Sequence, residues 1–184
     1  MVESDASILA PLAGFYAAAG RPLPAAHTIG GAAMPRAVAR LLSAPEPLTP
    51  RLEAHVGEPL ALRVLERRRD GDRYARCVVL VRGDGIPAVL GAIAIDLRRL
   101  APAVRAEVLA ETVPFGRLLA NASAPPDALL SVACDRFIAD ALALSERDVS
   151  LYGRRRTLTD ASGAVIATIL EILAPEPEQL ARVG

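Results

Sequence analysis

Residues 151–175 read LYGRRRTLTDASGAVIATILEILAP, and this stretch decides the fold that we expect. Two runs flank the polar segment 160–163, which ends in glycine, the residue type that most easily adopts a positive φ. This pattern predicts a β-hairpin. The first arm carries three consecutive arginines, and the second arm is apolar apart from Glu171 and Thr168.

Glu171 lies within the apolar arm of the predicted hairpin. Removing a carboxylate from water costs several kcal/mol unless a cation or hydrogen-bond donors meet it, or unless its pKa rises until it holds a proton. Two interpretations follow. Glu171 either points to solvent from an edge strand, or it is a carboxylate tuned for proton transfer inside a pocket.

Composition excludes several classes of function. The 21 basic and 21 acidic side chains balance, which argues against a nucleic-acid or anionic-membrane partner. No apolar run reaches the ~18–20 residues needed to span a bilayer, and no signal peptide opens the chain, so we expect a cytoplasmic protein. With only two histidines and two well-separated cysteines, we expect no metal site.

Hydrophobic periodicity predicts three further strands, over residues 59–68, 73–82 and 86–96, joined at Gly-containing turns. Helical spacing predicts helices over 8–19, 35–43, 97–111 and 128–144, with a short one beginning at 117. Hairpins with helices between them and no βαβ alternation indicate an α+β fold, in which helices cover one face of an antiparallel sheet. We expect an Ala/Pro-rich N-terminal extension over residues 1–33 and a single domain over 34–184.

Four short segments, in chain order, carry a resemblance to a known family. They are PLT at 47–49; RCVVLV at 76–81 with the turn DGIP at 84–87; PFGRLL at 114–119; and LYGRR at 151–155 with EIL at 171–173. Their order and spacing resemble the chorismate pyruvate-lyase family, enzymes that split chorismate into 4-hydroxybenzoate and pyruvate. The resemblance covers roughly residues 35–175.

This resemblance implies a chorismate lyase-like (UTRA-like) fold of about six antiparallel strands, with helices on one side and a buried pocket under flaps. It implies that Arg76 binds the ligand and that Glu171 is the essential glutamate, with main-chain amides contributed by Leu48 and Phe115. It implies no cofactor and no metal. The wider structural superfamily includes ligand-sensing domains of transcription regulators.

The chemistry of such a ligand agrees with these residue types. An arginine in an apolar strand can grip a ring carboxylate through two hydrogen bonds. Elimination of pyruvate from chorismate removes a ring proton and produces an aromatic ring, so the protein mainly orients the substrate and handles one proton. Arg76 is therefore the predicted carboxylate anchor, and Glu171 the predicted acid/base.

Several positions depart from the family pattern. Cys77 replaces a family glutamate, Leu170 replaces a threonine, and the last hairpin needs about two extra residues at its turn to bring Glu171 into register. Ile169 and Glu171 have the same parity in the strand, so they share a face. Arg154 and Arg156 likewise share a face, and we expect one or two of the three arginines to be solvated.

Two functions stay open at this point. The first is a chorismate pyruvate-lyase, and the alternative is a non-catalytic binding or sensor domain of the same fold for an aromatic carboxylate. In both, the expected partner is a small molecule rather than nucleic acid or a membrane. The sequence makes no prediction of the oligomeric state.

Overall fold

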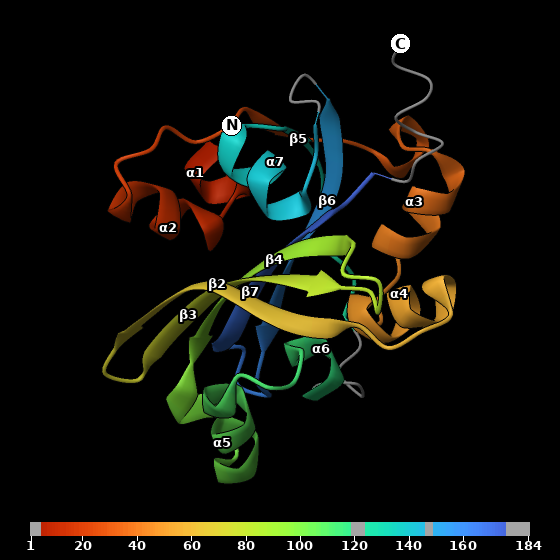
Figure 1. Ribbon diagram of the computed structural model, residues 1–184. Coiled ribbons are helices and arrows are strands. Elements are labelled where there is room, and N and C mark those ends of the chain that lie inside the picture. The colour runs from red at the N-terminus through yellow and green to blue at the C-terminus, as the bar shows by residue number, and fades with distance from the viewer. Residues whose placement is uncertain (1–4, 119–123, 146–148, 176–184) are drawn as a thin grey trace.

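The computed structural model describes residues 5–118, 124–145 and 149–175, and Figure 1 shows their arrangement. One antiparallel sheet has the strand order β1-β5-β6-β7-β4-β3-β2. Its strands are β1 (Ala26–Thr28), β2 (Ala61–Asp70), β3 (Arg73–Val81), β4 (Pro87–Asp96), β5 (Ala128–Ala133), β6 (Ser150–Thr159) and β7 (Val165–Leu173). The α+β class and the antiparallel sheet are confirmed, with seven strands in place of about six.

Helices lie on both faces of this sheet (Figure 1). They are α1 (Asp5–Ile8), α2 (Leu12–Ala18), α3 (Arg36–Leu42), α4 (Leu48–Val56), α5 (Pro102–Ala110), α6 (Phe115–Leu118) and α7 (Arg136–Leu142), with 3-10 turns η1 (Gly31–Ala33) and η2 (Leu97–Arg99). Apolar residues of α1, α2 and α7 pack with Cys77, Leu90 and Leu170. Residues of α3 to α6 pack on the opposite face. The expectation of helices on one face therefore covers only part of the arrangement, because the central strands are apolar on both sides.

The predicted helix over residues 128–144 is wrong in its first half. Ala128–Ala133 forms β5, which pairs with β6 in the register Leu130 to Gly153. The α7 helix begins only after Asp135, whose Oδ1 accepts a hydrogen bond from the Ile138 amide at 2.9 Å. This short run is apolar at both helical and strand spacing, so its period alone could not separate the two structures.

The segment before residue 34 contributes to the same core in its described part. β1 pairs with β5, and Phe15 and Tyr16 of α2 are buried against the sheet. The hydroxyl of Tyr16 donates a hydrogen bond to Asp135 at 2.8 Å, which connects α2 to the start of α7. A domain boundary at residue 34 stays a prediction.

Alternation along the strands places the arginines of the predicted hairpin on defined faces. The side covered by α3 to α6 carries Arg154 and Arg156 of β6 and Glu171 of β7. Leu151 of β6 and Leu170 of β7 have the opposite parity and pack in the core on the other face. The shared parity of Ile169 and Glu171 also holds, since both line one cavity on that side. The face that carries the charged residues is thereby fixed.

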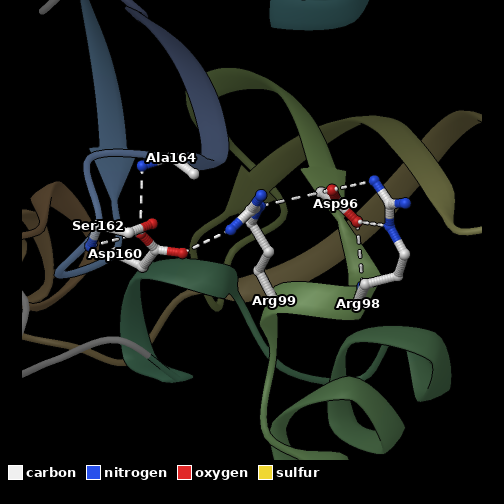
Figure 2. Close-up of polar contacts among 6 residues, drawn as sticks. All are labelled: Asp96, Arg98, Arg99, Asp160, Ser162 and Ala164. Carbon is white, nitrogen blue, oxygen red and sulfur yellow. Dashed lines mark hydrogen bonds and ion pairs between the residues drawn. The ribbon is translucent and has the colours of Figure 1, made fainter.

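Asp160 organises the turn between β6 and β7 (Figure 2). Its Oδ1 accepts hydrogen bonds from the Ser162 amide at 2.9 Å and the Ala164 amide at 3.1 Å, and its Oδ2 accepts one from Arg99 at 2.6 Å. Arg99 also lies 3.6 Å from Asp96, so the turn is connected to the end of β4. The Ser162 hydroxyl and these amides lower the pKa of Asp160 to about 2.

Replacing Asp160 with asparagine gives an expected loss of stability that depends on pH. The pKa of Asp160 falls from an ordinary 3.8 to about 2 in the folded chain. The carboxylate therefore stabilises the fold fully above pH 3.8, and this contribution disappears as the pH falls towards 2. Tm of wild type and Asp160→Asn, measured from pH 7 downwards, should converge in acid. A constant Tm difference over this range would contradict the assignment, and Asp70→Asn, at the exposed end of β2, is the control.

Candidate functional site

A small cavity of about 60 Å³ lies between the sheet and the segments that begin α4 and α6. Its walls are mostly apolar, and their only charged side chains, within the part of the chain that the structure describes, are Arg76, Arg156 and Glu171. The lining residues are Pro47, Thr49, Leu62, Arg76, Val78, Leu80, Val89, Gly91, Ala92, Ile93, Pro114, Phe115, Gly116, Arg156, Leu158, Ile169 and Glu171.

Strand register places the two lining arginines at opposite ends of one cross-strand row. Arg76 on β3 pairs with Ile93 on β4, Ile93 pairs with Ile169 on β7, and Ile169 pairs with Arg156 on β6. Glu171 lies two residues farther along β7, opposite Gly91. The isoleucines therefore form an apolar floor between two cations, with a carboxylate on the adjacent row.

Arg76 is 1% exposed, and main-chain carbonyls hold its guanidinium at one edge. Its Nη1 donates to the carbonyl of Val108 at 3.3 Å, and its Nη2 donates to the carbonyl of Val113 at 3.2 Å. Burial lowers the pKa of Arg76, although nearby Tyr74 and Glu111 oppose the shift. An arginine keeps its charge in proteins, so the buried group stays a cation. Its Nε has no hydrogen-bond partner within the described residues.

Glu171 is paired with Arg154 rather than with Arg76. The Nε of Arg154 donates to the Glu171 carboxylate at 2.6 Å, and the side chain of Arg154 is completely buried. The other nitrogens of Arg154 donate to the carbonyls of Ala44 at 2.8 Å and Glu46 at 3.2 Å. Arg154 therefore connects the segment between α3 and α4 to the sheet and fixes the position of Glu171.

The expectation that one or two of the three arginines are solvated is wrong. Arg154 is 0% and Arg156 2% exposed, and the side chain of Arg155, on the opposite face, is 15% exposed. The reason is that the connection between α3 and α4 covers Arg154, whereas Arg156 lies in the wall of the cavity beneath the segments that begin α4 and α6. Strand parity assigns the face but does not reveal what covers it.

The predicted site residues come together only in part. Arg76, Glu171 and Phe115 all line the cavity, and Phe115 is the first residue of α6. The Leu48 side chain is buried in the apolar cluster with Leu42 and does not line the cavity, whereas its neighbours Pro47 and Thr49 do. Ligand contacts through the amides of Leu48 and Phe115 stay a prediction. Arg154 and Arg156 are the residues that sequence reasoning missed.

The roof of the cavity forms where α4 and α6 meet. The carboxylate of Glu53 on α4 accepts hydrogen bonds from Arg117 of α6 and from the Leu60 amide, the latter at 2.8 Å. Burial opposes ionisation of Glu53, but these hydrogen bonds outweigh it and lower its pKa. A side chain at Gly116 would place its Cβ 2.8 Å from Thr49 Oγ1, so the two helices approach closely because position 116 is glycine.

Replacing Gly116 with valine should lower the free energy of unfolding by about 1–3 kcal/mol, the usual cost of inserting atoms into a packed contact. The new Cβ would lie 3.2 Å from the Cβ of Thr49 as well, so rotation of one hydroxyl does not relieve the overlap. Chemical denaturation followed by circular dichroism measures the change. Gly30→Val is the matched control, since a Cβ at Gly30 meets nothing within 4 Å. Equal stability of the two variants would show that α4 and α6 do not touch in this way.

Comparisons with known proteins give no family assignment. No family model matches the chain, and no curated protein matches it. Among solved structures, it is similar to a GntR-family transcriptional regulator from Bacillus cereus, with 13% identity and a TM-score of 0.47 over 64% of this chain and 93% of that one. It is also similar to the C-terminal domain of the histidine utilization repressor from Pseudomonas syringae, with 12% identity and a TM-score of 0.47 over 65% of this chain and 93% of that one.

A third similar structure is PhnF from Mycobacterium smegmatis, with 12% identity and a TM-score of 0.49 over 69% of this chain and 62% of that one. With TM-scores below 0.5 and identities this low, these similarities assign neither family nor function to the chain. The site must therefore be interpreted from its own geometry.

None of the helices in the described ranges has the length and apolar character of a membrane-spanning segment. The same residues contain no cluster of three or more His, Cys, Asp or Glu side chains suited to a metal ion.

Proposed function

We propose that this chain binds a small aromatic carboxylate in the cavity, with Arg76 as the anchor, and that it acts as a binding or sensor domain. The observation that carries the proposal is the buried Nε of Arg76, which has no hydrogen-bond partner among the described residues. Buried polar groups in proteins are almost always satisfied, so an unpartnered donor at a cavity needs an explanation such as a bound ligand.

Charge supports an anionic ligand. The guanidinium of Arg76 is 1% exposed, and its two hydrogen-bond acceptors are neutral carbonyls. Glu111, which accepts a hydrogen bond from Tyr74, offsets part of the cost of burying this charge, but no ion pair joins it to Arg76 among the described residues. A ligand carboxylate within hydrogen-bonding reach would offset more of that cost. Glu171 does not serve this purpose, because its carboxylate pairs with Arg154.

The walls of the cavity support an aromatic or similarly flat apolar body on that ligand. Ile93, Leu158 and Phe115 line the cavity together with Arg76. Gly91, which lies opposite Glu171 on the cavity face of β4, removes a side chain from the floor. An apolar lining with a few placed polar groups is typical of small-molecule sites, whereas the free volume of about 60 Å³ is below the ~300–1,000 Å³ that is usual for them.

The test of binding is thermal stabilisation of the whole chain by 4-hydroxybenzoate. A ligand that binds only the folded state raises the free energy of unfolding by about 2.7 kcal/mol at a concentration 100 times its Kd. The matched control is 4-hydroxybenzamide, which has the same shape and no charge. Saturable stabilisation by the acid and little by the amide is the expected result. Equal stabilisation by the acid and the amide, or no stabilisation by either, would show that the cavity does not recognise a carboxylate.

Chorismate pyruvate-lyase activity is the second candidate function. It is favoured by the presence of Glu171 in the same cavity as Arg76, the pair that the sequence resemblance implies. Only Oε2 of Glu171 accepts a hydrogen bond from a described residue, so Oε1 is available to accept a proton. In this reaction Glu171 takes the ring C4 proton, the C4–H electrons complete the aromatic ring, and the C3–O bond breaks to release the enolate of pyruvate. The enolate takes up a proton at its methylene carbon, which becomes the methyl group of pyruvate, and the proton on Glu171 balances this uptake.

Turnover separates this candidate from a sensor. If the chain is a lyase, chorismate incubated with it gives pyruvate and 4-hydroxybenzoate in equal amounts, and Glu171→Gln lowers kcat by about 10²–10⁴-fold, the usual contribution of a general base. The same variant should still bind 4-hydroxybenzoate, because Arg76 is unchanged. Binding without turnover identifies a sensor, and equal turnover by wild type and Glu171→Gln excludes the catalytic role.

A further inference from the structure

We infer that Arg156 is a second anion-binding residue of the cavity, so that the ligand carries negatively charged groups at both ends. This inference rests on the proposed function and names the class of ligand more narrowly. Arg156 is 2% exposed and lines the cavity, and its Nε and Nη2 are buried with no hydrogen-bond partner within the described residues. It thus leaves more donors unpartnered than Arg76, at which only the Nε is unpartnered.

Arg154 and Arg156 differ in how many of their donors are used by described residues. Both side chains lie on the same face of β6, two residues apart, and both are buried. Arg154 uses its donors on Glu171 and on the carbonyls of Ala44 and Glu46. Arg154 therefore already connects β6 to its covering segment, and in the described ranges no contact of this kind explains the burial of Arg156.

Among the described residues, no carboxylate forms an ion pair with Arg156, as none does with Arg76. Burial lowers its pKa, and repulsion from Arg154 adds to this effect, while Glu171, Asp127 and Glu46 oppose it from a distance. None of these carboxylates lies within the 4.0 Å of an ion pair with Arg156 in the described part of the chain. A ligand anion would supply the missing hydrogen bonds and charge together.

Register gives the shape of such a ligand. Arg76 and Arg156 are the two ends of one row, with Ile93 and Ile169 between them. Three interstrand steps of about 4.8 Å separate their Cα atoms by roughly 14 Å, and the long side chains reach inwards from both ends. A short, flat dianion with an apolar middle, lying across the isoleucines, would contact both guanidinium groups.

Isothermal titration calorimetry with three probes tests this inference. The probes are benzene-1,4-dicarboxylate, 4-carbamoylbenzoate (nearly the same shape, with one charge removed) and benzoate. Wild type should bind the dicarboxylate at least about tenfold more tightly than 4-carbamoylbenzoate, a difference of about 1.4 kcal/mol. In Arg156→Met this preference should disappear, while the affinity for benzoate, held by Arg76, should change less than about threefold.

Each outcome of this experiment decides one statement. If benzoate binds through Arg76 but Arg156→Met keeps the preference for the dicarboxylate, the second anchor is wrong and the proposed function stands. If no probe binds to wild type, both fail. The stability of the unliganded variant is an independent readout. Arg156→Met removes a buried, unpartnered charge and should leave Tm unchanged or raised, so a large fall in Tm would show a structural role instead.

Discussion

Arg154→Met should lower the free energy of unfolding by about 3–5 kcal/mol, because it leaves Glu171 as a largely buried carboxylate without its cation. The side chain of Arg154 is 0% exposed and that of Glu171 is 14% exposed, so solvent screens this pair weakly. The variant also loses the hydrogen bonds to the carbonyls of Ala44 and Glu46, which connect the segment before α4 to the sheet. Urea denaturation followed by far-ultraviolet circular dichroism measures the change.

Two controls separate the ion pair from a general loss of arginine. Arg63→Met removes an exposed arginine from β2 of the same sheet and should change stability by less than about 0.5 kcal/mol. The double variant Arg154→Met, Glu171→Leu removes both charges and should recover part of the lost stability. Burying two apolar side chains costs less free energy than burying one unpaired charge. An Arg154→Met variant as stable as Arg63→Met would show that the pair is not buried as described.

The second large effect is on binding. Arg76→Met should weaken the affinity for 4-hydroxybenzoate by about 10- to 100-fold, because hydrogen bonds to charged groups contribute about 1.5–3 kcal/mol. The methionine keeps an apolar side chain of similar length next to Ile93, so the shape of the cavity changes little. Titration calorimetry of wild type and variant gives the two Kd values.

The matched control for this prediction is again Arg63→Met, which should bind as wild type does. The second control is 4-hydroxybenzamide, the uncharged analogue of the ligand. Its weak affinity should be the same for wild type and Arg76→Met. Retention of full affinity for the acid in Arg76→Met would place the carboxylate elsewhere, and the anchor would then have to be sought at another cation.

Sequence patterns predicted the frame of this site because strand alternation and turn chemistry are local. The hairpin of β6 and β7, its turn at Asp160, and the shared face of Ile169 and Glu171 follow from residues close together in the chain. The same holds for β3 and β4, whose turn contains Gly85 at φ +83°. These elements need no knowledge of what packs on them.

The parts that sequence reasoning missed depend on distant contacts. Glu171 was expected to face Arg76, and both do line the cavity, but its ion-pair partner is Arg154, directly opposite it on β6. Arg154 looks like a solvated strand residue until the segment before α4, some 110 residues earlier, covers it, and Arg156 is buried at the wall of the cavity. A run of three arginines beside one glutamate in an apolar strand was the available signal, but pairing Arg154 with Glu171 requires the register of β6 on β7, which shifts between Leu158 and Thr159.

The central claim is that a carboxylate binds the buried guanidinium of Arg76. A crystal structure of the chain with 4-hydroxybenzoate tests it most directly. The account predicts ligand density in the cavity, with a carboxylate oxygen about 3 Å from Arg76 Nε, the donor that has no other partner among the described residues. A ligand that lies outside the cavity, or one whose hydroxyl rather than carboxylate contacts Arg76, would contradict it.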